Sequence, residues 1–327
     1  MTATLHATAL AHPNIAFIKY WGNRDDQLCL PLTGSLSMAL DGLDTVTQVN
    51  FNPDLTTDRF ILNGMEQSGA TLNRVALFLD YVRKLAGLTH FAQVESNNNY
   101  PSGAGIASSA AAFAALALAA SKAAGLDLSE RELSRLARLG SGSACRSVPG
   151  GFAEWLPGSR DADSYAIQIA PPEHWDLVDL IVVVDRSEKA VGSSAGHKLA
   201  ETSPLQALRV AGVPERLEQC RTAVLTRDFE RLAQVVELDS EWMHAVMRTS
   251  NPPLYYWKPA TEVVLWNVRA WRAQGHAVCA TVDAGPNVHV IALGQEASWA
   301  EAQLRALPSV QEVLTAKPGG GAKILEQ

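Results

Sequence analysis

The chain has 327 residues, of which 47% are hydrophobic and 19% are charged, a composition typical of globular proteins with a large core. Its formal net charge of -7 excludes binding of nucleic acid or anionic lipid through bulk electrostatics, so any phosphate site must be a local pocket. The four cysteines form no CxxC pair, which favours a reduced, cytoplasmic protein, and neither a secretory signal nor a membrane span is predicted.

Strands and turns alternate in the first part of the chain. Period-two patterning predicts a strand over 45–51, and a second strand over 59–64 runs into a turn. Helical spacing follows over 73–86. The stretch 91–113 then reads as a strand, a polar loop with glycines and a helix. A further helix begins after Ser129, with Glu132 completing a capping box, and ends at Gly140.

The second part of the chain contains more helix. A buried strand is predicted over 177–189, followed by mainly helical sequence to about residue 274 and by two strands around a turn within 276–293. The predicted fold is of the α/β (α+β) class, with a strand-rich αβ unit followed by an α+β unit. We expect two domains, 1–190 and 191–327.

The stretch NIAFIKYWGNRDD, residues 14–26, places a lysine at the end of an apolar strand. A buried ammonium group is costly unless it is paired, so Lys19 should meet an anion. A lysine whose head reaches solvent is the alternative.

PSGAGIASSAAAF, which begins at Pro101, could bind phosphate. Gly103 and Gly105 would let backbone N–H groups approach a ligand, and Ser108 and Ser109 add hydroxyls in the first turn of a helix. The alternative is a tight turn into an alanine-rich core helix. The polar run 96–99 just before it favours a nucleotide site.

Two further stretches could carry chemistry. In GSGSACRS, residues 140–147, Arg146 could hold a carboxylate or phosphate with two hydrogen bonds, although this stretch taken alone favours a capped helix with a surface arginine. In TVDAGPN, Asp283 ends a strand and could orient or deprotonate a hydroxyl, although aspartate is also a common turn former.

The eight histidines show no metal-ligand spacing and are expected to be structural or exposed.

Taken together and in this order, NIAFIKYWG, NNYPSGAGIASSAAAFAALA, RLGSGSACRS, GGFAEW and DAGPN resemble the mevalonate diphosphate decarboxylase family of the GHMP kinase superfamily. The resemblance extends from Ala11 to about Leu325. It implies a GHMP-kinase-like fold of two domains with the active site in the cleft between them, and a homodimer.

The resemblance also implies a reaction. ATP and Mg2+ would serve to phosphorylate the tertiary 3-hydroxyl of a 5-phosphorylated mevalonate, and loss of that phosphate would drive decarboxylation to an isopentenyl product. Asp283, Lys19, Arg146 and Ser109 are the implied catalytic residues, with Asp283 on the 3-hydroxyl, Lys19 near the transferring phosphate and Arg146 on the carboxylate.

The remaining implied site residues fall into two groups. The substrate-binding residues are Asn14, Tyr20, Asn23, Arg74, Ser141, Ser143 and Ser193. The ATP-binding residues are Ser96, Asn98, Pro101, Gly103, Gly105, Ser108 and Ser109, and Ser108 is also a candidate ligand of Mg2+.

The sequence departs from the family at the phosphate end of the substrate. The family usually reads KYWGK, and the lysine points at the terminal phosphate in diphosphate-using relatives, whereas this chain has Asn23. Some bacterial relatives also carry an arginine where this chain has Ser194. Loss of positive charge should weaken binding of a terminal phosphate most, so mevalonate 5-phosphate is the favoured substrate. The alternative is a diphosphate decarboxylase in which Arg24 replaces the missing lysine.

Two further functions remain possible on this fold. One is a mevalonate 3-kinase that stops before decarboxylation, against which the intact GSGSACRS stretch argues. The other is a non-catalytic binding protein, against which the presence of Asp283, Lys19 and the serine loop argues.

Overall fold

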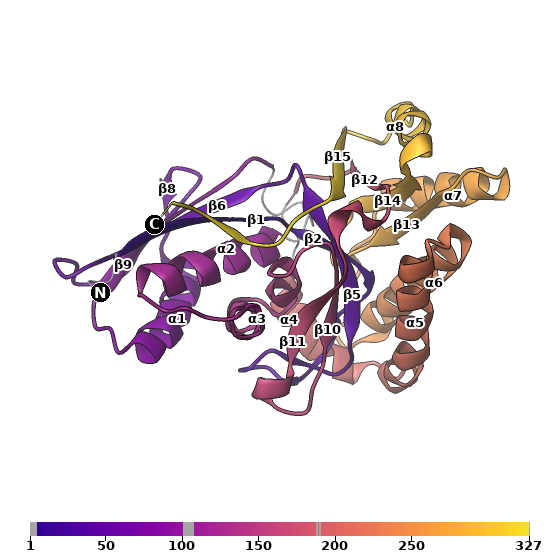
Figure 1. Cartoon of the computed structure of the whole chain (residues 1–327). Coiled ribbons are helices and arrows are strands. Elements are labelled where there is room, and N and C mark those ends of the chain that lie inside the picture. The colour runs from indigo at the N-terminus through magenta and orange to yellow at the C-terminus, as the bar shows by residue number, and fades with distance from the viewer. Residues whose placement is uncertain (1–4, 101–107, 188, 190, 327) are drawn as a thin grey trace.

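The computed structural model describes residues 5–100, 108–187, 189 and 191–326. Two sheets organise this part of the chain (Figure 1). The first has the strand order β16-β1-β6-β9-β7-β8, and the second has the order β11-β10-β5-β15-β12-β14-β13 with β2 beside β5. A short ribbon pairs β3 with β4.

The strand bounds are as follows. The strands are β1 His6–Ala11, β2 Asn14–Ile18, β3 Asn23–Asp25, β4 Leu30–Pro31, β5 Ser35–Asp41, β6 Thr45–Asn52, β7 Arg59–Leu62, β8 Met65–Glu66, β9 Phe91–Asn98, β10 Phe152–Leu156, β11 Tyr165–Ala170, β12 Leu177–Val183, β13 Val278–Val282, β14 Val288–Leu293, β15 Glu312–Pro318 and β16 Lys323–Glu326.

Helices cover both sheets. The α-helices are α1 Gly69–Ala86, α2 Ser108–Ala123, α3 Glu130–Gly140, α4 Ser193–Leu199, α5 Gln206–Thr226, α6 Phe229–Thr249, α7 Pro259–Ala273 and α8 Ala297–Arg305. Helix α2 packs against β1 and β6, while α5 and α6 lie side by side and pack against β2 at the other end of the molecule (Figure 1). A 3-10 turn over Gly142–Ser147 follows α3.

Most predicted elements are present, and specific hydrogen bonds account for two of their ends. The capping box of α3 is formed, with Ser129 and Glu132 bonded to each other's backbone N–H. Helix α1 begins four residues before the predicted start at residue 73. The strand predicted over 177–189 ends at Val183, because the N–H groups of Val184 and Asp185 turn to the side chain of Asn287.

Alanine and small residues form much of the core between α2 and the first sheet. Ala7, Ala9 and Ala11 alternate inward along β1, and α2 presents a run of buried alanines to them. In the part of the chain that is described, no helix is long and apolar enough to cross a membrane.

Strand pairing crosses the predicted domain boundary at residue 190 in both sheets. β12 lies between β14 and β15, β15 also pairs with β5, and β16 pairs with β1. The division into 1–190 and 191–327 stays a prediction.

Candidate active site

A cleft of about 740 Å³ lies between elements from the two halves of the chain, and it gathers most of the predicted site residues. Its lining residues fall within the segments 16–29, 74–81, 108–109, 139–146, 192–198 and 283–284, together with Lys189 and Met243, although not every residue of a segment lines the cleft. Predicted site residues among its lining are Lys19, Tyr20, Asn23, Arg74, Ser108, Ser109, Ser141, Ser143, Arg146, Ser193 and Asp283. Pro101, Gly103 and Gly105 lie outside the described residues.

Lys19 is buried and paired with an anion, as expected for a lysine at the end of an apolar strand. Its Nζ lies 2.6 Å from Oδ1 of Asp283, the residue after β13 at the far end of the chain. The Lys19 side chain is 1% exposed and that of Asp283 is 25% exposed, so the pair opens to the cleft on the carboxylate side. Burial alone would raise the pKa of Asp283, but the Lys19 ammonium, assisted by Arg146, holds that pKa below its ordinary value.

The backbone of Lys19 is fixed by a buried ionic cluster under the cleft. Its N–H donates to Oδ2 of Asp239 at 2.6 Å, and its carbonyl accepts from Arg209 at 2.7 Å. Arg209 also donates to the carbonyl of Trp21, and Arg216 donates to Oδ1 of Asp239. Helices α5 and α6 therefore set the direction of the lysine side chain through hydrogen bonds to its main chain.

Arg146 is buried rather than on the surface, which overturns the alternative of a capped helix with a surface arginine. Its Nε and Nη2 donate to Oδ1 of Asn14, and its Nη1 donates to Ser35. Asn14 in turn donates to Ser147. These three bonds use three of the five N–H groups of the guanidinium, so the others can serve a ligand carboxylate in the cleft.

The glycines of GSGSACRS permit close packing. A Cβ on Gly140 would lie 1.9 Å from the ring of Phe113, and a Cβ on Gly142 would lie 2.7 Å from the ring and hydroxyl of Tyr20. Ser141, between them, shares a hydrogen bond of 3.2 Å with Ser109 at the start of α2. The motif thus packs closely against the ring of Tyr20 and the first turn of α2, and all three line the same part of the cleft.

A second cavity of about 370 Å³ joins the cleft at Arg74, Ser108 and Ser109, which line both. Ser96 and Asn98, which were predicted to bind ATP, lie in its wall. Its remaining lining is mostly apolar, including Phe60, Val75, Val94 and Leu116. Arg74 donates twice to the carbonyl of Gly140.

Asn23 is bonded on both sides of its amide. Its Oδ1 accepts from the hydroxyl of Tyr20 at 2.5 Å, and its Nδ2 donates to the carboxylate of Asp26 at 2.9 Å. Asp26 also lines the cleft. Arg24 is directed elsewhere, because its Nη2 donates to the carbonyl of Pro157 and the residue is not in the cleft wall.

Lys189 and His197 are two of the cleft residues that the sequence did not predict. Lys189 donates from Nζ to Ser193 and to the carbonyl of Ala284, next to Asp283. His197 lies one helical turn after Ser193 on α4. Neither residue belongs to a recognised motif. The one signal in the sequence is the i, i+4 spacing of Ser193 and His197, which places these two side chains on one face of a helix.

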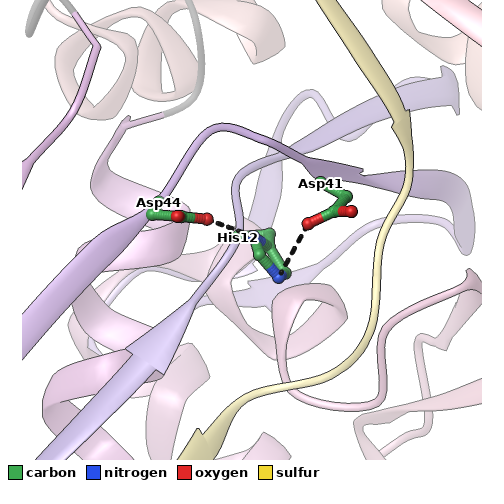
Figure 2. Close-up of side chains that lie close together, drawn as sticks. All are labelled: His12, Asp41 and Asp44. Atoms are coloured by element: carbon green, nitrogen blue, oxygen red, sulfur yellow. Dashed lines mark ion pairs between the residues drawn. The ribbon is translucent and has the colours of Figure 1, made fainter.

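His12 lies outside the cleft lining, between two carboxylates (Figure 2). Its Nδ1 is 3.1 Å from Asp44 and its Nε2 is 3.8 Å from Asp41. The ligand atoms of these residues lie within 4.8 Å of one another, a proximity that sequence spacing did not predict. Because the two carboxylates face opposite ring nitrogens of His12, the arrangement suits ion pairs between the histidine and the two aspartates better than joint binding of one metal ion.

Comparison with known proteins identifies the family. The model of the diphosphomevalonate decarboxylase-like N-terminal domain matches residues 11–166, and that of the mevalonate 5-diphosphate decarboxylase C-terminal domain matches residues 179–319. The chain belongs to the diphosphomevalonate decarboxylase family. Similar curated proteins include diphosphomevalonate decarboxylases of Ganoderma lucidum, 40% identical over 86% of this chain and 76% of that protein, and of Bos taurus, 39% identical over 88% and 76%.

Solved structures of the family superpose over nearly the whole chain. The mevalonate diphosphate decarboxylase of Staphylococcus aureus gives a TM-score of 0.94 at 38% identity, covering 98% of each chain. That of Enterococcus faecalis gives 0.92 at 39% identity, covering 98% of this chain and 99% of that one. A structure described as MDDEF in complex with MVAPP, AMPPCP and magnesium gives 0.93 at 40% identity, with the same coverage.

These comparisons confirm the predicted family and the two-domain α/β fold. The predicted enzyme class, an ATP-dependent decarboxylase acting on a phosphorylated mevalonate, is confirmed by the curated relatives. The predicted use of a nucleotide with magnesium is confirmed at the level of the family by the MDDEF complex. The predicted homodimer and cytoplasmic location stay predictions.

Proposed function

We propose that this protein converts mevalonate 5-phosphate and ATP into isopentenyl phosphate, ADP, phosphate and CO2, with Mg2+ as the metal cofactor. The observation that carries the choice of the monophosphate is the hydrogen bonding of Asn23. An amide stands where the family usually has a lysine, and it is held between the hydroxyl of Tyr20 and the carboxylate of Asp26. A terminal phosphate placed there would meet a carboxylate instead of an ammonium group.

Asp283 and Lys19 would act on the 3-hydroxyl. Because the pKa of Asp283 is lowered, its carboxylate is ionised at neutral pH and can accept a hydrogen bond from that hydroxyl. It is a weak base, which suits phosphoryl transfer through a loose transition state, where the hydroxyl proton is lost late. The Lys19 ammonium, held at 2.6 Å from the carboxylate, offers positive charge to the transferring phosphoryl group.

Arg146 would hold the substrate carboxylate for the second step. When the phosphorylated 3-oxygen leaves with its bonding electron pair, the electrons of the bond to the carboxylate carbon form the new double bond, and CO2 departs. A carboxylate fixed by Arg146 and its partner Asn14 is kept in the geometry that this fragmentation requires.

ATP would occupy the smaller cavity with its phosphates directed into the cleft. Ser96 and Asn98 lie in the wall of that cavity, and the hydroxyls of Ser108 and Ser109 stand where the two cavities join. Helix α2 begins at these serines and runs for 16 residues, so its positive end also faces this junction. Mg2+, with Ser108 as a candidate ligand, would neutralise phosphate charge when bound.

Mevalonate 5-diphosphate is the second candidate substrate. It is favoured by the names of the curated relatives and by the exposed Lys198, which lines the cleft next to His197. Arg24 no longer supports this alternative, since it bonds to Pro157 outside the cleft.

The test is ATP-dependent CO2 release by the purified protein, with the monophosphate and the diphosphate assayed side by side. A higher kcat/KM for the monophosphate supports the proposal, and a higher value for the diphosphate contradicts it. ADP formation without CO2 would indicate a 3-kinase instead. Absence of ATP binding would indicate a non-catalytic protein.

A further inference from the structure

His197 occupies the end of the cleft where Tyr20 and Asn23 meet. It lies four residues after Ser193 on α4, and both residues line the cleft. Its ring is tilted against that of Tyr20, with centroids 4.2 Å apart, and against that of Trp21 at 4.6 Å. The imidazole is therefore held in one orientation by two aromatic neighbours that belong to the KYWG stretch.

One ring nitrogen of His197 is committed to the main chain. The N–H of Gly22 donates to Nδ1 at 3.0 Å, so Nδ1 must present a lone pair. Burial, with the nearby charges of Arg209 and Lys189, lowers the pKa of His197 to about 3, so the ring is neutral at physiological pH. A neutral imidazole with a lone pair on Nδ1 carries its proton on Nε2.

The Nε2–H group is available to a ligand. Among the described residues, none accepts a hydrogen bond from Nε2. Nε2 is also absent from the fully buried polar atoms that lack a partner, so a ligand in the cleft can reach it. The Tyr20 hydroxyl and the implied substrate-binding residues Ser141 and Ser143 also line the cleft, and Tyr20 bonds to Asn23, the residue at which the proposed function puts the phosphate end of the substrate.

We propose that Nε2–H of His197 donates a hydrogen bond to the 5-phosphate of the substrate. This inference rests on the proposed function for the identity of the ligand. It makes His197 a substrate-binding residue that supplies a donor without positive charge. Hydrogen bonds to charged groups are stronger than neutral ones, so loss of this donor should weaken substrate binding about 10- to 100-fold.

The test compares two variants with the wild-type enzyme. His197→Phe keeps an aromatic ring against Tyr20 and Trp21 but removes the donor, and His197→Gln restores an amide that can donate and accept. We expect KM for mevalonate 5-phosphate to rise about 10-fold or more in His197→Phe and to recover partly in His197→Gln. KM for ATP should change by less than about 3-fold in both.

Unphosphorylated mevalonate, used as a competitive inhibitor, distinguishes loss of a contact with the phosphate from general damage to the site. Its inhibition constant should be the same in wild type and His197→Phe, because it has no phosphate to lose. An equal rise in that constant, or in KM for ATP, would assign His197 a packing role only and overturn the proposal. An unchanged KM for the monophosphate would overturn it as well.

The ring proton can also be observed directly in the folded wild-type enzyme. Long-range 1H–15N spectra, with the His197 signal assigned from the variants, should show the Nε2–H tautomer and a shift of Nε2 on adding the monophosphate. A proton on Nδ1, or a charged ring, would overturn the proposal. Should the enzyme prefer the diphosphate, the proposed substrate would be wrong, while the same experiments with the diphosphate would still decide the role of His197.

Discussion

Nζ of Lys19 and Oδ1 of Asp283 lie 2.6 Å apart, although 264 residues of sequence separate them. The pair joins the end of β2 to the end of β13 across the cleft, so the site is assembled only when both halves of the chain are folded together. Because the carboxylate is the more exposed partner, a substrate hydroxyl can reach it without breaking the ion pair.

Replacing Asp283 should separate catalysis from nucleotide binding. Asp283→Asn keeps the shape of the side chain but removes the negative charge and the capacity to take a proton. We expect kcat to fall by roughly 100- to 10,000-fold, while the dissociation constant for ATP, measured by calorimetry, stays close to the wild-type value. Loss of ATP binding in this variant would show that Asp283 has a different role.

The ion pair should also give stability a defined pH dependence. The pKa of Asp283 is lowered in the folded state, so the pair contributes stability above the ordinary carboxyl pKa of about 4, and this contribution is lost as the pH falls through the lowered value. In Lys19→Gln, burial acts on Asp283 without the ammonium and favours the protonated form. The difference in unfolding free energy between wild type and variant, from urea titrations, should therefore be larger at pH 7 than at pH 4. An equal difference at both pH values would contradict the assignment.

Asn23 should control the choice between the two phosphorylated substrates. Asn23→Lys places an ammonium beside Asp26 and Tyr20, so the ratio of kcat/KM for diphosphate over monophosphate should rise about 10-fold or more. Arg24→Gln is the matched control, because Arg24 bonds to Pro157 outside the cleft and its loss should leave the ratio unchanged. If the ratio does not move in Asn23→Lys, charge at this position does not set specificity.

The cluster beneath Lys19 should matter for stability as well as for catalysis. Asp239 is fully buried between Arg209 and Arg216, so Asp239→Asn leaves two buried guanidinium groups without their counter-charge. We expect a loss of about 3–5 kcal/mol in unfolding free energy. The surface pair Glu301–Arg305 provides the comparison, since Glu301→Gln should cost less than about 1 kcal/mol. Similar losses in the two variants would rule out a structural role for the cluster.

Much of the fold follows from local sequence patterns, and much of the site does not. Alternation along 45–51 and the Ser129–Glu132 capping box predicted β6 and the start of α3, because both depend on neighbouring residues. The resemblance implied that Lys19 lies near the transferring phosphate, but its pairing with Asp283 was not predicted. Arg146 and Asn14 were implied together only through the carboxylate they would hold, since no local periodicity encodes contacts over such separations.

Lys189 and His197 escaped prediction for a related reason. The segment between β12 and α4 has no clear periodicity, and the strand was expected to continue through Lys189, although its apolar run ends at Val184 and polar residues follow. The end of the strand is set by Asn287, about a hundred residues later, whose side chain takes the N–H groups of Val184 and Asp185. A lone histidine in a short helix becomes a candidate site residue only when the main-chain N–H of Gly22 and the ring of Tyr20 are seen beside it.

The last two strands have a consequence for how the chain acquires its structure during synthesis. β15 inserts between β12 and β5, and β16 covers the outer edge of β1. A ribosome that has made the first 300 residues therefore carries a nascent chain whose central sheet lacks an interior strand and whose first sheet has an open edge. Until residues 312–326 emerge, these unpaired edges are open to pairing with other chains, so protection by chaperones would be most valuable before β15 and β16 are added.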